Sequence, residues 1–207
     1  MLLSKISALI DCKKIYNIKK KDNSFNFLST NSKYIRKNSV LVINKKNNFK
    51  KKYIDESIKN GAIAIITNFY FKNIKLPQFL VDNISSSVKN LLLALKKIPP
   101  SNIIGVTGTN GKTSVVWNVC NIAFLSKKNI KSYGTLGYYN NLKKIENSIL
   151  TTPEYEILHQ KAYTKKNKNE CEFIFEVSSH SISKKRIKNF LMKNLRRIFQ
   201  IYFTKSK

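Results

Sequence analysis

The sequence has few of the residues that build disulfide frameworks, metal clusters or membrane spans. Its three cysteines, Cys12, Cys120 and Cys171, are far apart and form no Cys-x-x-Cys pair, so they predict neither a disulfide framework nor a metal site. No stretch approaches the roughly 20 apolar residues that a membrane-spanning helix needs. The amino terminus lacks the small-residue cleavage site of a secretory signal peptide. These absences predict a cytoplasmic protein in a reducing compartment, with no membrane partner.

Acidic residues are also scarce, because 11 Asp and Glu stand against 39 Lys and Arg, for a formal net charge of +28. Such an excess first suggests a nucleic-acid or anionic-membrane partner. The lysines, however, are spread along the whole chain among Asn, Ile, Phe and Tyr, and all five residue types have AT-rich codons. A coding sequence that drifts toward AT produces this composition without selection for a polyanion. We therefore expect no nucleic-acid partner, and a basic surface that attracts anionic nucleotide substrates.

The first half of the chain alternates between strand-like and helix-like segments. A hydrophobic fraction of 42% over 207 residues suits one large globular domain or two small ones. Short apolar runs predict strands, and segments with apolar residues on one helical face predict helices. The predicted strands are 40–43, 62–68 and 79–81, and the predicted helices are 49–60 and 84–97. Pro99 and Pro100 then interrupt the pattern, which predicts a boundary between domains at 1–98 and 99–207.

The second half repeats this alternation around a glycine-rich loop. Residues 102–124 predict a strand, a loop and a helix, and strands follow at 130–136 and 171–178. A helix is expected at 153–165, with Pro153 in its first turn. The basic segment 184–207 contains no Asp or Glu and shows only a vague helical repeat. The predicted fold class is α/β, with a small amino-terminal α/β domain followed by an incomplete doubly wound domain of the P-loop type.

The sharpest motif is Gly-Val-Thr-Gly-Thr-Asn-Gly-Lys-Thr at residues 105–113. Glycines let backbone N–H groups turn toward a phosphate, and the following helix adds its positive amino-terminal dipole. Lys112 would supply a full charge to the phosphates and Thr113 a hydroxyl to Mg²⁺. The general motif places a glycine where this chain has Val106, so the loop is a variant. The alternative is a glycine-rich turn with an incidental Gly-Lys-Thr.

Three motifs together resemble the Mur ligases. Residues 105–114 are similar to the ATP loop that this family shares with the folylpolyglutamate synthetases. Leu-Thr-Thr-Pro at 150–153 and Glu-Val-Ser-Ser-His at 176–180 are similar to two further motifs of the Mur ligases, and Tyr-Gly-Thr-Leu-Gly at 133–137 fits between them. The combination looks like the tripeptide synthetases, which add the third residue to UDP-N-acetylmuramoyl-L-Ala-D-Glu. Asn-Ser-Lys at 31–33 stands where these synthetases carry Asp-Ser-Arg at the uridine site, whereas their usual Asp-Gly pair is replaced by residues 47–50.

The resemblance implies a role for individual residues. Lys112 and Glu176 would be catalytic, and Thr113 and Glu176 would bind Mg²⁺. Contacts to the muramoyl-dipeptide substrate are implied for Ser32, Thr151, Thr152, Ser178 and Arg186. Contacts to ATP are implied for Gly108, Thr109, Asn110, Gly111, Lys112, Thr113 and Ser114. Two alternatives stay open, a solvent-facing Glu176 at a strand end and a helix cap formed by the threonines.

The implied reaction is an ATP-dependent amide-bond formation through an acyl phosphate. The family's later motifs, its carbamylated lysine and its carboxyl-terminal domain are not found in these 207 residues. One expectation is a ligase that is truncated and inactive alone, or complemented by a second chain. A second expectation is a non-catalytic nucleotide-binding remnant. A third is a basic P-loop protein that acts on nucleic acid, against which the Thr-Thr-Pro and Glu-Val-Ser-Ser-His motifs argue. The amino acid added is expected to be meso-diaminopimelate by analogy alone.

Overall fold

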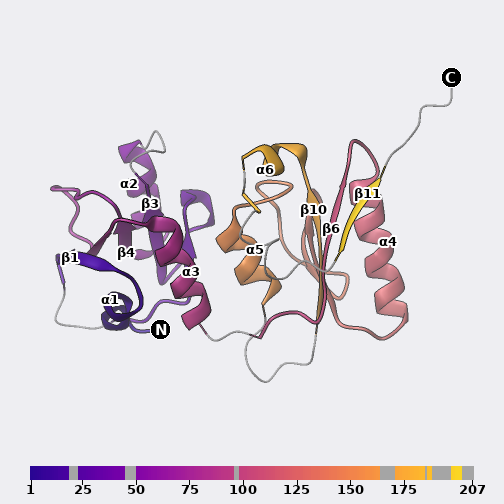
Figure 1. The fold of residues 1–207 in the computed structure, drawn as a ribbon, viewed down its shortest axis with the longest axis horizontal. Helices are drawn as coiled ribbons and strands as arrows, with labels where there is room; N and C mark the ends of the chain where they lie inside the picture. Colours follow the sequence, from indigo (N-terminus) through magenta and orange to yellow (C-terminus); the bar gives the residue numbers. More distant parts are fainter. Residues whose placement is uncertain are drawn as a thin grey trace. The chain divides into compact units, whose positions relative to one another are not determined.

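A computed structural model describes residues 1–18, 23–44, 50–95, 98–163, 171–184 and 186–187, together with the backbone of 197–201. The chain divides into two compact units, Met1–Lys96 and Lys97–Lys207. Each unit contains one β-sheet with helices packed against it (Figure 1). The α/β fold class predicted from the alternating pattern is confirmed.

The sheet of the first unit has five described strands in the order β1-β5-β4-β3-β2. The strands are β1 (Cys12–Tyr16), β2 (Phe27–Ser29), β3 (Ser39–Ile43), β4 (Ala62–Thr67) and β5 (Gln78–Val81). Strands β2 to β5 are parallel, and β1 pairs antiparallel with β5 at the edge. The continuous burial of β3 is typical of a parallel strand that is covered on both faces.

Helices cover both faces of this first sheet. Its helical elements are η1 (Leu3–Lys5), α1 (Ile6–Leu9), η2 (Ser32–Tyr34), α2 (Lys51–Lys59) and α3 (Ile84–Ala94). Ile54 of α2 packs with Leu41 and Ile43 of β3 in one core cluster. Val40 and Val42 point to the opposite face because side chains alternate along a strand, and both are buried as well. Helix α3 contacts β3 and packs against α1.

The sheet of the second unit has six described strands in the order β11-β6-β10-β7-β8-β9. They are β6 (Ile103–Gly108), β7 (Ile130–Gly134), β8 (Gly137–Asn140), β9 (Lys143–Glu146), β10 (Glu172–Val177) and β11 (Arg197–Ile201). Strands β11, β6, β10 and β7 are parallel, whereas β8 and β9 add an antiparallel edge. The prediction of a central parallel strand that leads into the glycine loop is confirmed for β6.

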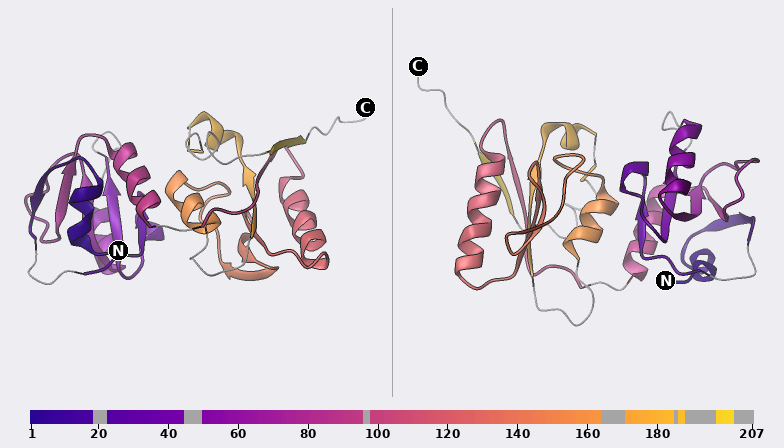
Figure 2. Two further views of the ribbon diagram at one scale, coloured as in Figure 1. Left: turned by 60° about the horizontal axis from the view of Figure 1, so that its bottom comes forward. Right: turned by 180° about the vertical axis from the view of Figure 1, so that it is seen from behind.

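Helices α4 (Lys112–Leu125) and α5 (Tyr155–Ala162) cover opposite faces of the second sheet, as Figures 1 and 2 show. The alternation along β10 explains this arrangement. Ile174 packs with α4 in one cluster, whereas Phe173 and Phe175 join α5 in another. A short helix, α6 (Ser179–Ser183), follows β10. The functional segments of this unit therefore lie on a sheet that is fixed from both sides.

One expectation for a helix is wrong, and one segment without a clear prediction forms a strand. Helix α5 begins at Tyr155 after the extended Glu154, so Pro153 precedes the helix instead of occupying its first turn. Residues 197–201 form strand β11, because pairing with β6 outweighs the vague helical repeat. Residues 185, 188–196 and 202–207 of the basic segment lie outside the described residues. They include Phe203 and Thr204, where the resemblance to the Mur ligases implies the start of the next strand-end motif.

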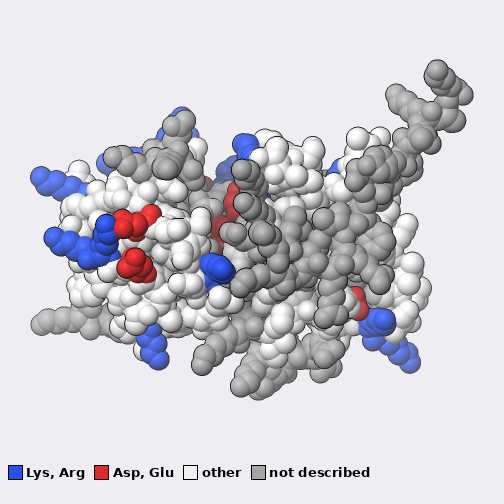
Figure 3. Space-filling model, in the orientation of Figure 1, with Lys and Arg blue, Asp and Glu red and all other residues white. Residues whose placement is uncertain are grey.

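No helix in the described part of the chain is both long and apolar enough to cross a bilayer. On the face drawn in Figure 3, the described Lys and Arg side chains are scattered. One of the lysines, Lys13, pairs with Asp82 at 2.8 Å. Exposed pairs of this kind contribute little to stability.

Candidate functional site

The glycine loop joins the end of β6 to the start of α4. Strand β6 ends at Gly108, and α4 begins at Lys112, directly after Gly111. Gly111 has a φ of 76°, in the left-handed region that is unfavourable for residues with side chains. Gly111 is also the N-cap residue and offers no capping side chain. The first N–H groups of α4 and the positive end of its dipole are therefore directed at the loop, an arrangement that favours an anion.

Lys112 folds back over this loop. Its Nζ atom donates hydrogen bonds to the main-chain oxygens of Gly108 at 2.8 Å and Thr109 at 3.3 Å. Neither carbonyl group neutralises the ammonium charge, so the charge remains available to an anion at the loop. Thr113 follows in the first turn of the helix and is half-buried, whereas Ser114 is exposed.

Glu176 lies at the carboxyl end of β10, next to β6 in the sheet. Its side chain is 2% exposed, which rules out the alternative of a solvent-facing glutamate. One carboxylate oxygen, Oε1, accepts a hydrogen bond from the main-chain N–H of Thr135 at 2.8 Å, and Oε2 accepts one from the Thr135 hydroxyl at 3.1 Å. Burial of a carboxylate is costly unless such partners are present.

Thr113 and Glu176 line the same small pocket, although they are far apart in the sequence. Gly134, Leu136 and Trp117 are among the other residues of its wall. This juxtaposition follows from the topology, because β6 and β10 are parallel neighbours and their carboxyl ends meet at one edge of the sheet. The structure therefore places in one pocket wall the two residues for which the resemblance implied metal binding.

The threonines of the Leu-Thr-Thr-Pro segment are connected to the same strand end. Thr152 is buried, and its hydroxyl donates to the main-chain oxygen of Glu176 at 2.8 Å and accepts from the N–H of Ser178 at 2.9 Å. Arg186 donates to the main-chain oxygen of Thr152 at 3.2 Å. The hydroxyl of Thr151 lies 3.2 Å from that of Thr135. The alternative that Thr152 caps a helix is not supported, because its hydroxyl bonds to the end of β10.

Ser32 lies in the first unit, where it begins the short helix η2. It is buried, and its hydroxyl donates to Oε2 of Glu56 on α2 at 2.6 Å. The first unit also contains a pocket of about 460 Å³, but Ser32 is not part of its wall. The pocket is lined by Lys51, Ile54, Phe69, Phe71, Lys72, Asn73 and Ile74.

Sequence reasoning gave no role to Thr135 and Trp117. Thr135 was visible only as part of the Tyr-Gly-Thr-Leu-Gly motif, which gave no hint that its hydroxyl reaches a strand distant in sequence. Trp117, the single tryptophan of the chain, packs edge-on against Tyr139 with ring centroids 5.3 Å apart. A helical tryptophan normally signals core packing, so no local pattern placed it in the pocket wall.

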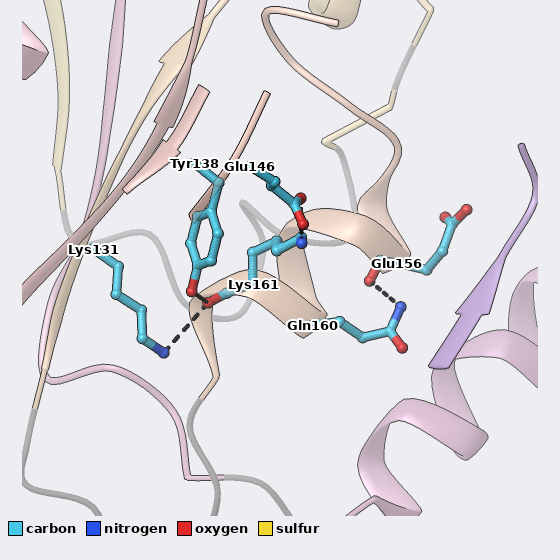
Figure 4. Close-up of polar contacts among 6 residues, drawn as sticks. All are labelled: Lys131, Tyr138, Glu146, Glu156, Gln160 and Lys161. Carbon is cyan, nitrogen blue, oxygen red and sulfur yellow. Dashed lines mark hydrogen bonds and ion pairs between the residues drawn. The ribbon is translucent and has the colours of Figure 1, made fainter. Parts of the chain in front are cut away.

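A second group of polar contacts holds the carboxyl end of α5 (Figure 4). Lys131 and Tyr138 both donate to the main-chain oxygen of Lys161, at 3.4 Å and 3.1 Å. The ammonium group of Lys161 pairs with Glu146 and lies 4.8 Å from the ring centre of Tyr138. Burial raises the pKa of the Tyr138 phenol, so the neutral donor persists. These contacts anchor the helix that follows the Thr151–Thr152 segment.

A glycine loop between a central parallel strand and a helix, with a buried acid at the end of the neighbouring strand, defines an α/β domain of the phosphate-loop class. The family model of the Mur ligase middle domain matches residues 106–195. This stretch of the second unit belongs to the Mur ligase family.

Individual relatives agree with this assignment. The chain is 33% identical over 177 residues to UDP-N-acetylmuramoyl-L-alanyl-D-glutamate--2,6-diaminopimelate ligase of Wigglesworthia glossinidia brevipalpis, a match that covers 79% of the chain and 35% of that protein. It is 29% identical over 178 residues to the protein of the same name from Rickettsia typhi, covering 83% and 36%. A solved structure of a ligase with this name superposes with a TM-score of 0.50 and 21% identity over 79% of the chain and 34% of the other. The chain thus spans about a third of the length of these relatives.

Proposed function

We propose that the chain is part of an ATP-dependent ligase that adds the third residue of the peptidoglycan stem peptide to UDP-N-acetylmuramoyl-L-Ala-D-Glu in the cytoplasm. The observation that carries this proposal is the meeting of Thr113 and Glu176 in the wall of one pocket. Lys112 lies beside Thr113 at the start of α4, Thr152 bonds to the end of β10, and Thr151 contacts Thr135. The names of the two relatives supply the substrate class, and meso-diaminopimelate is accordingly the proposed amino acid.

The donor set fits a magnesium ion shared with nucleotide phosphates. In the described ranges, no three His, Cys, Asp or Glu residues cluster as a metal cage would require. The pocket instead offers one carboxylate, from Glu176, and one hydroxyl, from Thr113. Mg²⁺ suits such a site because it prefers oxygen ligands, keeps several waters and shares phosphate oxygens with the substrate. When bound, it would neutralise charge on the phosphates.

The proposed chemistry has two steps, a phosphoryl transfer to the substrate carboxylate and an attack by the incoming amine. An oxygen of the substrate carboxylate attacks the γ-phosphorus of ATP, the bond to the bridging oxygen breaks, and ADP leaves. The amine then attacks the acyl carbon, the bond from carbon to the phosphate oxygen breaks, phosphate leaves, and the amine loses a proton to water. Lys112 and the N–H groups at the start of α4 would hold the phosphates and offset their charge during transfer.

On the substrate side, we propose that Thr151, Ser178 and Arg186 contact the dipeptide end of the acceptor. Thr152 would hold the end of β10 in place, since its hydroxyl bonds to the backbone of Glu176 and Ser178. The first unit would bind the uridine nucleotide, with Ser32 at that site. Glu56, which accepts the hydrogen bond of the Ser32 hydroxyl, would orient it there.

An isolated polypeptide of residues 1–207 is expected to bind nucleotide without forming the amide bond. Its matches leave about two thirds of the relatives' length uncovered. Loss of even one preorganised charge contact costs an enzyme on the order of a hundredfold in rate. A second chain that carries the uncovered region is the proposed partner for restoring activity. An ordinary ligase rate from residues 1–207 alone, followed by ADP and tripeptide release, would contradict this expectation.

The test of the ligase assignment titrates the acceptor substrate. Residues 1–207 are saturated with ADP and Mg²⁺, and UDP-N-acetylmuramoyl-L-Ala-D-Glu is added in a calorimeter. We expect binding that Thr151→Val weakens about tenfold, the usual cost of a hydrogen bond to a charged group. Thr67→Val is the matched control, because its hydroxyl bonds to Phe69 in the first unit. If a mixed-sequence oligonucleotide bound tightly and the UDP substrate did not bind, the nucleic-acid alternative would be favoured and the proposal rejected.

A further inference from the structure

Thr135 makes contacts that no assigned role explains. It is an exposed residue directly after β7, yet it provides one hydrogen bond to each oxygen of the buried Glu176 carboxylate. The main-chain N–H reaches Oε1 at 2.8 Å, and the hydroxyl reaches Oε2 at 3.1 Å. Two bonds from one residue fix both the position of a carboxylate and the plane in which it lies.

The residue before Thr135 makes this approach feasible. A Cβ atom on Gly134 would lie 2.2 Å from Oε1 of Glu176 and 2.7 Å from its Cγ atom. No side chain fits at that distance, so a residue other than glycine would push the carboxylate away. Gly134 has an ordinary φ, which means that space and not backbone conformation requires the glycine. The end of β7 is therefore shaped to receive the Glu176 side chain.

The direction of the hydrogen bonds connects this arrangement to the Thr151–Thr152 segment. The hydroxyl of Thr135 has one proton, which it donates to Oε2 of Glu176. In the 3.2 Å contact between Thr135 and Thr151, the donor is therefore Thr151. Thr152 in turn donates to the main-chain oxygen of Glu176. Adjacent threonines thus reach the same glutamate, one through its backbone and one through Thr135.

We infer that Thr135 is a positioning residue that orients the Glu176 carboxylate toward a divalent cation and ties it to Thr151. The inference rests on the proposed metal role of Glu176. Partners that orient a metal ligand without touching the metal commonly matter about tenfold or more for metal affinity. Because Thr135 is exposed, its replacement leaves the core intact, so a change in metal binding is separable from a change in folding.

The experiment measures Mn²⁺ binding, as a stand-in for Mg²⁺, by the loss of the free-ion electron paramagnetic resonance signal in the presence of ADP. We expect Thr135→Val to weaken Mn²⁺ binding about tenfold and Thr135→Ser, which keeps the hydroxyl, to restore it. Thr67→Val, which removes a buried hydroxyl from the first unit, is expected to leave Mn²⁺ binding unchanged. Melting temperatures of the Thr135 variants should stay near that of the parent chain.

Glu176→Gln distinguishes a failure of the positioning role of Thr135 from a failure of the metal role of Glu176. If it abolishes Mn²⁺ binding while Thr135→Val has no effect, the positioning role is rejected and the metal role of Glu176 stands. If Glu176→Gln itself leaves Mn²⁺ binding unchanged, the proposed metal role is rejected and the inference with it. Equal losses in Thr135→Val and Thr135→Ser would also reject the inference, because the hydroxyl would then not be the group that matters.

Discussion

At the scale of single residues, Gly134 connects the packing of the second sheet to the geometry of its pocket. A methyl group at this position would occupy the space of the Glu176 side chain. We predict that Gly134→Ala lowers the free energy of unfolding by about 1–3 kcal/mol, the range for overpacking a filled site. Chemical denaturation monitored by Trp117 fluorescence measures this change in the free energy of unfolding.

A double-mutant cycle provides the control for this prediction. Glu176→Ala removes the atoms that the new methyl group would meet, so Gly134→Ala should cost much less in that background. Equal costs in the two backgrounds would show that the clash with Glu176 is not the cause.

The sequence identified several residues of this pocket but not the contacts between them. The glycine loop and the Glu-Val-Ser-Ser-His motif located Thr113 and Glu176 of the pocket wall, and Lys112 beside Thr113, because strand, loop and strand end follow local patterns. The hydrogen bonds of Thr135 to Glu176 join positions far apart in the chain, and the burial of Ser32 against Glu56 depends on how η2 packs on α2. No local pattern contains such information, since it arises from tertiary packing.

At the scale of elements, the polar contacts at the end of α5 determine how firmly the Thr151–Thr152 segment is held. We predict that Tyr138→Phe lowers the free energy of unfolding by about 1 kcal/mol, because the main-chain oxygen of Lys161 loses its 3.1 Å hydrogen bond to the phenol. Tyr139→Phe is the matched control, since the contacts of Tyr139 are made through its ring. Thermal denaturation should separate the two variants, and equal effects would contradict the assigned contact.

The reactivity of the cysteines gives an independent check on how the helices and strands around them pack. Cys120 on α4 and Cys171 before β10 are buried in the second unit, whereas Cys12 in the first unit is partly exposed. Burial raises the pKa of both buried thiols, so little reactive thiolate is present. We predict that a thiol reagent modifies Cys12 first in the folded protein and reaches all three cysteines only after denaturation. Rapid modification of Cys120 in the folded state, read by peptide mass spectrometry, would contradict the packing of α4.

Pattern strength explains which elements could be predicted. Apolar β-branched runs located β3, β4 and β6, and one-sided helices located α2 and α3. The short or polar strands β1, β2, β8 and β9 were not predicted, because a strand such as Lys143–Glu146 has no buried face to leave a periodic signal. Strand β11 was not predicted either, since its state is decided by pairing with β6.

At the scale of the whole molecule, we expect the net charge of +28 to attract anions in general. On the face drawn in Figure 3 the described basic side chains are scattered, and Lys112 gains its proposed role from its place on the loop. A long-range field of this kind weakens as salt is added, because its range at about 0.1 M ionic strength is only about 10 Å. Contacts at the loop are short and should persist. Salt dependence therefore separates attraction by the surface from recognition at the pocket.

The central claim is that the loop and Glu176 form one magnesium-dependent nucleotide site. The measurement that tests it most directly is calorimetric titration of residues 1–207 with ATP at about 0.15 M ionic strength, with and without Mg²⁺, in the parent chain, Lys112→Ala and Glu176→Gln. We predict one site, an affinity that falls at least about tenfold in Lys112→Ala, and an enhancement by Mg²⁺ that Glu176→Gln removes. The claim would be contradicted if ATP did not bind, or if its affinity were the same with and without Mg²⁺ and in both variants.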